Sequence, residues 1–250
     1  MKAKPGLSAK SAWIRARKMD LQYGVQLRKI AHHIDLLTKQ FNPGEWASNA
    51  WIVKSLEDYA RALTPWAQSA GAKMIAEVAA RDRQAWAKVS AQMGRALHRE
   101  IDHAPTGEVL RQRLADQVDL ITSLPREAAE RVHVLTLQGI TEGTRAKEIA
   151  AKIFETGEVT KSRASTIART EVARTSTELT KARAEFVGST QFQWMTAGDG
   201  DVRQSHKVLN GRVFDWSNPP VCDHGKGGVE IRELPGCVWN CRCVSIPILA

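Results

Sequence analysis

The side chains best suited to chemistry are thiols and imidazoles gathered near the C-terminal end of the chain. Zn²⁺ prefers four nitrogen and sulfur ligands in a tetrahedral arrangement, and short Cys-x-His and Cys-x-Cys spacings could supply them from separate segments. The sequence therefore offers a structural zinc site, while free buried thiols and a disulfide stay open as alternatives, because spacing does not fix geometry. The candidate metal ligands are His206, Cys222, His224, Cys237, Cys241 and Cys243.

A second group combines carboxylate and guanidinium side chains. Glu171 and Arg174 are three residues apart and can form an ion pair on one helix face. An enzyme that transfers nucleotidyl or ADP-ribosyl groups, or a nuclease-like enzyme, could instead use Glu171 as a base together with Arg203 and His206. The phosphate-loop, dinucleotide, hydrolase-elbow and zinc-protease motifs are absent, so we expect structural roles and no enzyme. The structural candidates are Arg169, Glu171, Arg174, Asp199 and Arg203.

Positive charge is concentrated at the N-terminal end. The 250 residues carry 36 Lys or Arg and 27 Asp or Glu, a net charge of +9. Residues 1–40 hold nine of these cations and only two acidic residues. Such a segment could neutralise DNA phosphates, although a solvated basic face is the plainer interpretation. The candidate DNA-contacting residues are Lys10, Arg15, Arg17, Lys18, Arg28 and Lys29.

Hydrophobic patterning bears on where the chain resides. No apolar run approaches the roughly 18 residues that a membrane-spanning helix needs, and residues 11–20 are too polar for the core of a secretory signal. We therefore expect the chain to stay in a cytoplasm, where thiols are kept reduced.

The first three quarters of the chain have helical periodicity. Apolar residues recur at three- and four-residue steps from Trp46 to Leu63 and again from Trp86 to Ile101. Thr64-Pro65 predicts a helix restart. Further stripes predict helices over 110–121, from Ser123-Pro125 to about 139, over 146–154 and over 162–187, the last ending at Gly188.

The C-terminal segment has a different pattern. Residues 191–195 alternate polar and apolar like a half-buried strand, and 244–249 suit a short edge strand that contains Pro247. Asn210-Gly211 predicts a hairpin between 208–209 and 213–214. The predicted fold class is α+β: a mostly helical N-terminal region, then a small α+β module of short strands and irregular loops. We expect domains over 1–40, 41–139 and 140–250.

Five short patterns in a fixed order resemble the phage Mu F-like minor head protein family, the phage head morphogenesis family. They are IARTE at 167–171, W-x-T-x-x-D at 194–199, R-x-x-H at 203–206, L-x-G-x-x-F at 209–214, and PG at 235–236 followed by NCRC at 240–243. The resemblance covers about residues 140–250.

The resemblance implies a virion protein that is made in the host cytoplasm. Members are minor capsid components associated with the portal, required for head assembly and linked to DNA packaging or ejection. It also implies that His206, Cys241 and Cys243 define the module and are suspected metal ligands, whereas Cys222 and Cys237 lie where the pattern varies. Some relatives carry a toxin domain after the module, and we expect none here. The expected partners are portal and capsid proteins and double-stranded DNA.

Overall fold

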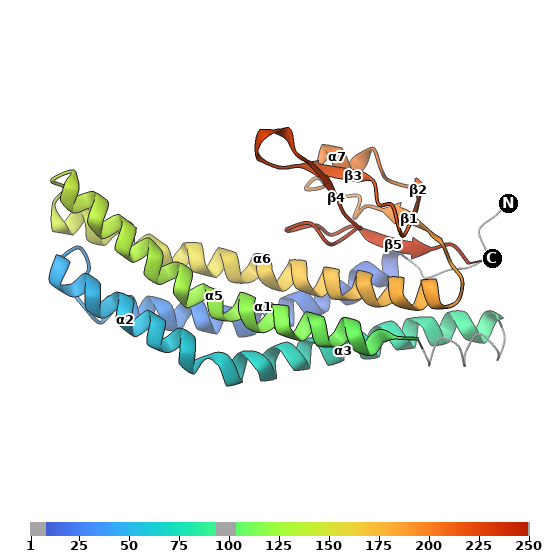
Figure 1. Ribbon diagram of the computed structural model, residues 1–250, viewed down its shortest axis with the longest axis horizontal. Helices are drawn as coiled ribbons and strands as arrows, with labels where there is room; N and C mark the ends of the chain where they lie inside the picture. Colours follow the sequence, from blue (N-terminus) through green and yellow to red (C-terminus); the bar gives the residue numbers. More distant parts are fainter. Residues whose placement is uncertain (1–8, 94–103, 250) are drawn as a thin grey trace. The chain divides into compact units, whose positions relative to one another are not determined.

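The computed structural model describes residues 9–93 and 104–249. Most of the first 186 residues are helical. The helices are α1 (Ala9–Lys39), α2 (Trp46–Ala62), α3 (Thr64–Met93), α5 (Thr106–Thr141) and α6 (Ala146–Phe186), as labelled in Figure 1. No helix among the described residues combines the length and apolar character that crossing a bilayer requires. The helical part of the predicted fold class is therefore confirmed.

The chain divides into two compact units, and α1, α3, α5 and α6 each contribute to both. One unit, here called the helical unit, consists of Gln22–Ala72 and Leu114–Ala168. The other, here called the mixed unit, consists of Met1–Leu21, Lys73–Arg113 and Arg169–Ala250. The domain boundaries at 40/41 and 139/140 are inferred from sequence patterns and stay predictions.

The helical unit is held together by aliphatic seams. Helices α5 and α6 approach each other closely at Gly139, where a Cβ would meet Ile149 Cγ1 at 2.5 Å. A buried hydrogen bond from Tyr23 Oη to Gln117 Oε1, 2.8 Å long, joins α1 and α5. The fully buried aliphatic side chains of this unit include Leu27, Ile34, Leu56, Ile121, Val132 and Ile153.

Two predicted interruptions of the helices do not occur. Pro125 lies inside α5, which is continuous, and α6 runs without a break through residues 155–161. Proline removes one backbone hydrogen bond and costs about 3 kcal/mol in a helix interior. Here Ile121, Leu124 and Ala128 are all buried around it, so burial on both sides of the proline outweighs that cost.

The mixed unit ends in a C-terminal module, residues 187–250, that contains all the strands in the described part of the chain. Strand β1 (Gln191–Met195) is central and pairs antiparallel with β2 (Val213–Asp215) and β5 (Val244–Pro247). A second antiparallel pair joins β3 (Val221–His224) and β4 (Glu230–Arg232). In sequence, helix α7 (Gln204–Lys207) lies between β1 and β2, and a 3₁₀ turn, η1 (Lys226–Gly228), lies between β3 and β4.

The strand predictions have mixed outcomes. The strand at 191–195 and the edge strand containing Pro247 are confirmed, and Gly188, with φ +81°, ends α6. The Asn210-Gly211 hairpin is wrong, because residues 208–211 form a turn and β2 pairs with β1. The Asn210 carboxamide accepts hydrogen bonds from the Thr196 backbone and hydroxyl at 2.9 and 3.1 Å, which fixes the turn beside β1.

The core of the module is aromatic and sulfur-rich. Fully buried Phe192 and Trp194 project from one face of β1, and the Phe192 and Trp216 rings lie 4.6 Å apart. All four cysteines are buried in this core and none forms a disulfide. Short strands bury little surface by themselves, so these large side chains supply most of the module's apolar packing.

Candidate metal centre

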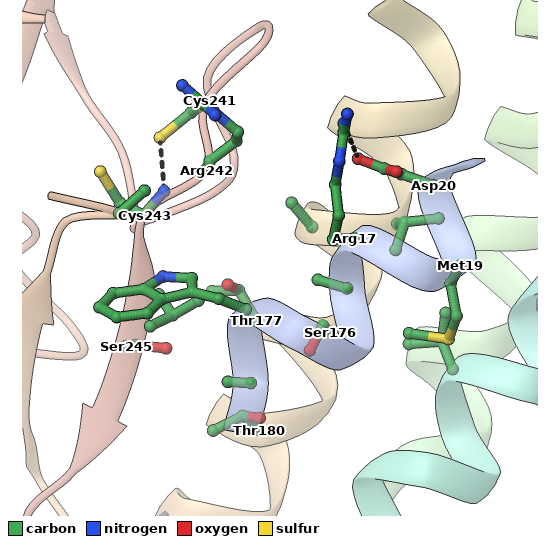
Figure 2. A pocket seen from close by; sticks show the side chains of 18 of the residues that line it. Arg17, Met19, Asp20, Ser176, Thr177, Thr180, Cys241, Arg242, Cys243 and Ser245 are labelled. Atoms are coloured by element: carbon green, nitrogen blue, oxygen red, sulfur yellow. Dashed lines mark hydrogen bonds and ion pairs between the residues drawn. The ribbon is translucent and has the colours of Figure 1, made fainter. Parts of the chain in front are cut away.

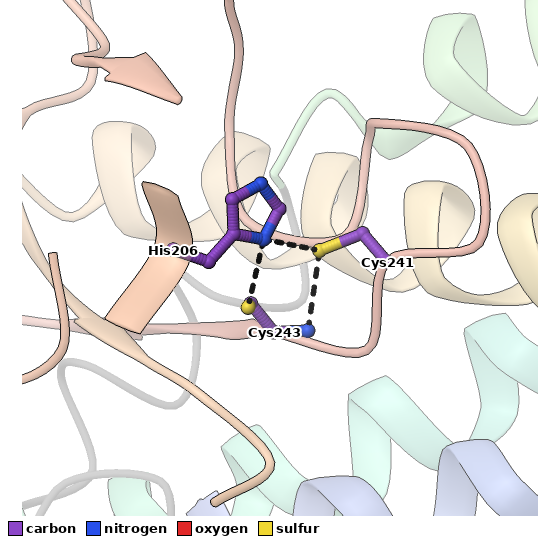
Figure 3. Close-up of side chains that lie close together, drawn as sticks. All are labelled: His206, Cys241 and Cys243. Atoms are coloured by element: carbon purple, nitrogen blue, oxygen red, sulfur yellow. Dashed lines mark hydrogen bonds between the residues drawn. The ribbon is translucent and has the colours of Figure 1, made fainter. Parts of the chain in front are cut away.

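Three of the candidate ligands meet in the C-terminal module. His206 lies on α7, and its Nδ1 is 3.5 Å from both Cys241 Sγ and Cys243 Sγ (Figure 3). The three ligand atoms all lie within 4.8 Å of one another. All three residues are almost fully buried, with exposed fractions of 2% for His206 and 3% for each cysteine. The group is therefore a compact nitrogen and sulfur donor set shielded from solvent.

The loop that carries the two cysteines is anchored to α6. Asn240 adopts a left-handed conformation, with φ +61°, which turns the chain between Trp239 and Cys241. Its backbone N–H donates to the buried Thr170 hydroxyl at 2.9 Å, and its side-chain oxygen accepts from Arg169 Nη1 at 2.6 Å. The IART segment of α6 therefore positions the NCRC loop, which explains why both patterns occur in one module.

Further hydrogen bonds hold the chain on either side of the site. Arg203 Nη2 donates to the Trp239 carbonyl at 2.7 Å, and Arg174 Nη2 donates to the Cys237 carbonyl at 2.7 Å. Arg242 pairs with Asp199 at 2.7 Å. Guanidinium groups suit this task because they offer several donors in a fixed fork. The arginines thus tie together segments that have little regular secondary structure.

The electrostatics of the group favour one thiolate. The pKa of Cys241 is lowered to about 4, mainly because the Cys243 thiol donates a hydrogen bond to its sulfur. Burial opposes this shift, whereas His206 and the Cys243 backbone N–H add to it. The same interaction raises the pKa of Cys243, because its proton is shared with the neighbouring sulfur and burial disfavours a second charge. A soft divalent cation would replace that shared proton and neutralise both sulfurs, which matches the donor preference of Zn²⁺.

The donor set has three members among the described residues, and a small pocket lies beside it. The pocket, with a volume of about 110 Å³, is lined by His206, Cys241 and Cys243 together with Asp201, Arg203 and their neighbours. That space accommodates a solvent molecule as a fourth ligand, completing a tetrahedron. His206 Nε2 is buried without a hydrogen-bond partner, which leaves Nδ1 as the ligating nitrogen.

The other candidate ligands lie outside this group. Cys222 is fully buried, its thiol donates to the Ile231 carbonyl at 3.5 Å, and burial raises its pKa to about 11. Burial also raises the pKa of Cys237, which packs in the same aromatic core. His224 ends β3 and is exposed. The structure therefore gives Cys222 and Cys237 the environment of neutral core thiols.

The residues of the enzymatic alternative do not share one cavity. Glu171 is fully buried on α6, where it forms ion pairs with Arg174 at 3.2 Å and Arg113 at 3.8 Å. It does not line the pocket that contains Arg203 and His206. The Glu171–Arg174 ion pair predicted from helical spacing is confirmed.

The basic candidates are distributed along α1. Arg17 is exposed and pairs with Asp20 at 3.4 Å, and Lys18 is exposed on the same turn. Arg28 is half-buried, and exposed Lys29 bonds Gln26. The side chains of Lys10 and Arg15 lie outside the described residues. Four of the six candidates are thus described, and none of those is fully buried.

Sequence reasoning overlooked two site residues, Thr170 and Asn240, as anchors. Both lay within the recognised patterns, yet neither side chain suggests chemistry by its type. Trp194 was noted only as part of the W-x-T-x-x-D pattern. Its ring lies edge-on to the His206 imidazole, with the ring centroids 5.4 Å apart. A non-glycine residue in left-handed turns is most often Asn, and this was the signal available at Asn240.

Comparison with known proteins agrees with these features. Residues 130–246 match the family model described as Phage Mu protein F like protein. The chain is 35% identical over 136 residues to an uncharacterized protein of Haemophilus influenzae, covering 54% of this chain and 28% of that protein. It is 29% identical over 128 residues to the NAD(+)--arginine ADP-ribosyltransferase EFV of Enterococcus faecalis, covering 49% of this chain and 26% of that protein. The aligned parts thus span about a quarter of each relative, and no solved structure matches.

Proposed function

We propose, from the premise that residues 130–246 form a Phage Mu F-like domain, that this chain is a structural component of a tailed-phage head. In this role it associates with the portal and other capsid subunits and supports head assembly and DNA packaging or ejection. The helical unit provides surface for subunit contacts, and the C-terminal module is a rigid element braced by a structural metal, most suitably zinc. The chain acts in the virion and, during assembly, in the host cytoplasm.

One observation carries the proposal. The residues of the family patterns hold the chain together: Arg169 and Thr170 bind Asn240, and Arg203 binds the Trp239 carbonyl. Catalytic groups need an accessible position against a substrate. Side chains engaged in mutual contacts are suited to maintaining a shape that another subunit recognises.

Deleting the gene from the phage or prophage that encodes it, and restoring variants, tests the proposal. We expect few infectious particles without the protein, and recovery with the wild type or with the exposed-site control Arg232→Ala. The Asn240→Ala variant should be depleted from purified heads when these are measured by quantitative mass spectrometry. Normal yields of infectious particles without the gene would contradict a role in head assembly.

The name of the Enterococcus relative raises an enzymatic alternative, ADP-ribosyl transfer using Glu171, Arg203 and His206. We expect no activity, because the Glu171 carboxylate is buried and ion-paired. Incubation of the purified chain with labelled NAD⁺ and an arginine-containing acceptor tests this. Transfer that Glu171→Gln abolishes while the fold is retained would favour the enzyme.

A DNA contact by α1 remains part of the proposed function. Deleting residues 1–40 would be a poor test, because Leu27, Ile30 and Ile34 of α1 belong to the core. Exposed Lys18 and Lys29 can instead be changed to Glu together. We expect weaker DNA binding and a shallower salt dependence, measured by fluorescence anisotropy. Unchanged binding would place the DNA contact elsewhere.

A further inference from the structure

The mixed unit contains a second, larger cavity, which adjoins the pocket beside His206 and shares Ala197, Cys241, Arg242 and Cys243 with it. Its volume is about 340 Å³, and its walls come from α1, α3, α6 and the segment that runs from Cys241 into β5. Figure 2 shows Arg17 and Asp20 of α1 beside α6, with Cys241, Cys243 and Ser245 on the side of β5. Small-molecule sites in proteins begin at about this size. The cavity is therefore large enough for a ligand of two fused or linked aromatic rings.

The greater part of the cavity wall is apolar. Trp13 and Met19 contribute from α1, Val78 from α3, Val172 from α6 and Ile246 from β5. An apolar body placed here would remove its own surface and that of these side chains from water, which is the main source of affinity in such sites.

The charged groups at the cavity are unevenly compensated. Four arginines line it, against three aspartates. Asp82 is already paired with Arg183, which does not line the cavity, and Asp199 is paired with Arg242. Asp20 lies beside Arg17 and Arg169, and burial raises its pKa, so its negative charge is the most weakly held of the three.

Arg81 is the cation best placed to meet a ligand. It is half-buried, lines the cavity, and has no ion-pair partner among residues 9–93 and 104–249. A partly buried guanidinium without an anion is electrostatically unsatisfied, and an incoming carboxylate or sulfonate would form charge-assisted hydrogen bonds with it. The excess of positive charge therefore selects for a negative ligand.

We propose that this cavity is a binding site for a small molecule with an apolar, aromatic body and one anionic group. The body lies against Trp13, Met19 and Val78, and the anion is held by Arg81. Cys241 and Cys243 border this cavity as well as the metal site, but the residues that hold the ligand lie on α1 and α3, so the proposal does not depend on the proposed role in head assembly.

A matched pair of fluorescent probes tests the proposal on the full chain. The anionic probe is 8-anilino-1-naphthalenesulfonate, and its uncharged counterpart is N-phenyl-1-naphthylamine, the same ring system without the sulfonate. We expect one site that prefers the anionic probe. Arg81→Gln should weaken the anionic probe roughly tenfold, the effect of losing one charged hydrogen bond, and leave the uncharged probe unchanged.

Filling the cavity with a larger side chain distinguishes probe binding at this site from nonspecific probe binding elsewhere on the protein. Ala85→Phe on α3 and Ala16→Phe on α1 should each abolish binding of both probes, while the circular dichroism spectrum stays native. Two variants are used so that the test still holds if one of them fails to fold. Val53→Phe, at the pocket lined by α2 and α5 residues in the helical unit, is the matched control and should have no effect. Equal affinity for both probes, or binding that survives both fillings, would overturn the proposal. So would binding that appears only after residues 1–8 are deleted, because the chain itself would then be the occupant.

Discussion

The helical unit and the C-terminal module are stabilised by different kinds of interaction. The helical unit buries aliphatic residues along helices that satisfy their own backbone hydrogen bonds, with close contacts such as that of Gly139 with Ile149. The module has strands of three to five residues, and its core combines aromatic rings with four thiols. Regular structure needs no cross-link, whereas irregular loops bury little area and benefit from a metal or from buried ion pairs.

Helix α6 belongs to both units and makes different contacts in each. Where α6 belongs to the mixed unit it carries Arg169, Thr170, Glu171 and Arg174, all in polar contacts with other segments. Where it belongs to the helical unit it contributes aliphatic residues such as Ile149 and Ile153 to the core. Both parts of α6 bury apolar residues, including Val172 and Leu179 in the mixed unit, and the mixed-unit part adds the polar side chains that anchor the module.

The largest effect should come from removing a sulfur ligand. Cys243→Ser should reduce bound zinc from about one equivalent to almost none and destabilise the module by more than about 4 kcal/mol, as expected when a structural metal is lost. Metal analysis and the near-ultraviolet circular dichroism of Trp194 and Trp216 measure this. The far-ultraviolet signal of the helical unit should persist, which separates the two regions.

Cys222→Ala is the matched control for that experiment, since it removes a buried thiol outside the donor group. Its cost should be about 1–2 kcal/mol from lost packing, with unchanged metal content. A chelator should lower the melting temperature of wild type and of Cys222→Ala but not of Cys243→Ser. Equal stability of the wild type with and without chelator would contradict a structural metal.

Glu171→Gln tests the polar end of α6. The substitution leaves the buried Arg113 and the half-buried Arg174 with less compensation, although Arg113 retains Glu178 at 3.1 Å. We expect a loss of about 3 kcal/mol in the free energy of unfolding, the low end for breaking a buried pair. Urea denaturation measures it, and Glu230→Gln, whose side chain is 58% exposed and pairs with Arg232, should change little. Unchanged stability would show that the buried pair does not anchor the module.

Gly139→Ala tests the aliphatic end in the same way. Alanine favours helices, yet its Cβ would lie 2.5 Å from Ile149 Cγ1, so we expect a net loss of about 1–2 kcal/mol and no sensitivity to chelator. Gly107→Ala, which meets nothing nearer than 3.8 Å, is the control and should be neutral or stabilising. Ile149→Val in the Gly139→Ala background should recover part of the loss. A stabilising Gly139→Ala would refute the close helix contact.

The smallest expected effect is that of Asp20→Asn. Burial raises the pKa of Asp20 above 3.8, so the protonated form favours the folded state, and this contribution is lost as the pH rises through the folded-state pKa. Asparagine mimics the protonated form. The variant should therefore melt slightly higher than wild type at pH 7, and the difference should vanish below pH 3.8. Asp58→Asn should have the opposite sign, because the hydrogen bond from Lys54 lowers the pKa of Asp58.

The sequence by itself determined the class of fold and the family. Apolar residues at three- and four-residue steps predicted helices, the alternation in 191–195 predicted β1, and five ordered patterns predicted the Phage Mu F-like domain, all of which are confirmed. These signals are local, since they depend on side-chain direction within one element or on short strings of residues. The sequence also identified His206, Cys241 and Cys243 as candidates, although among three further side chains of equal chemical promise.

The tertiary structure decided which of those side chains meet. His206 reaches Cys241 and Cys243 because α7 and the start of β5 are held beside β1, while the burial of Cys222 and Cys237 in the aromatic core leaves them outside the group. It also decided that α5 continues through Pro125, and that Thr170 and Asn240 bind each other across 70 positions of the chain. These outcomes depend on non-local burial, which can override a local helix-breaking preference and which no periodicity within one segment encodes.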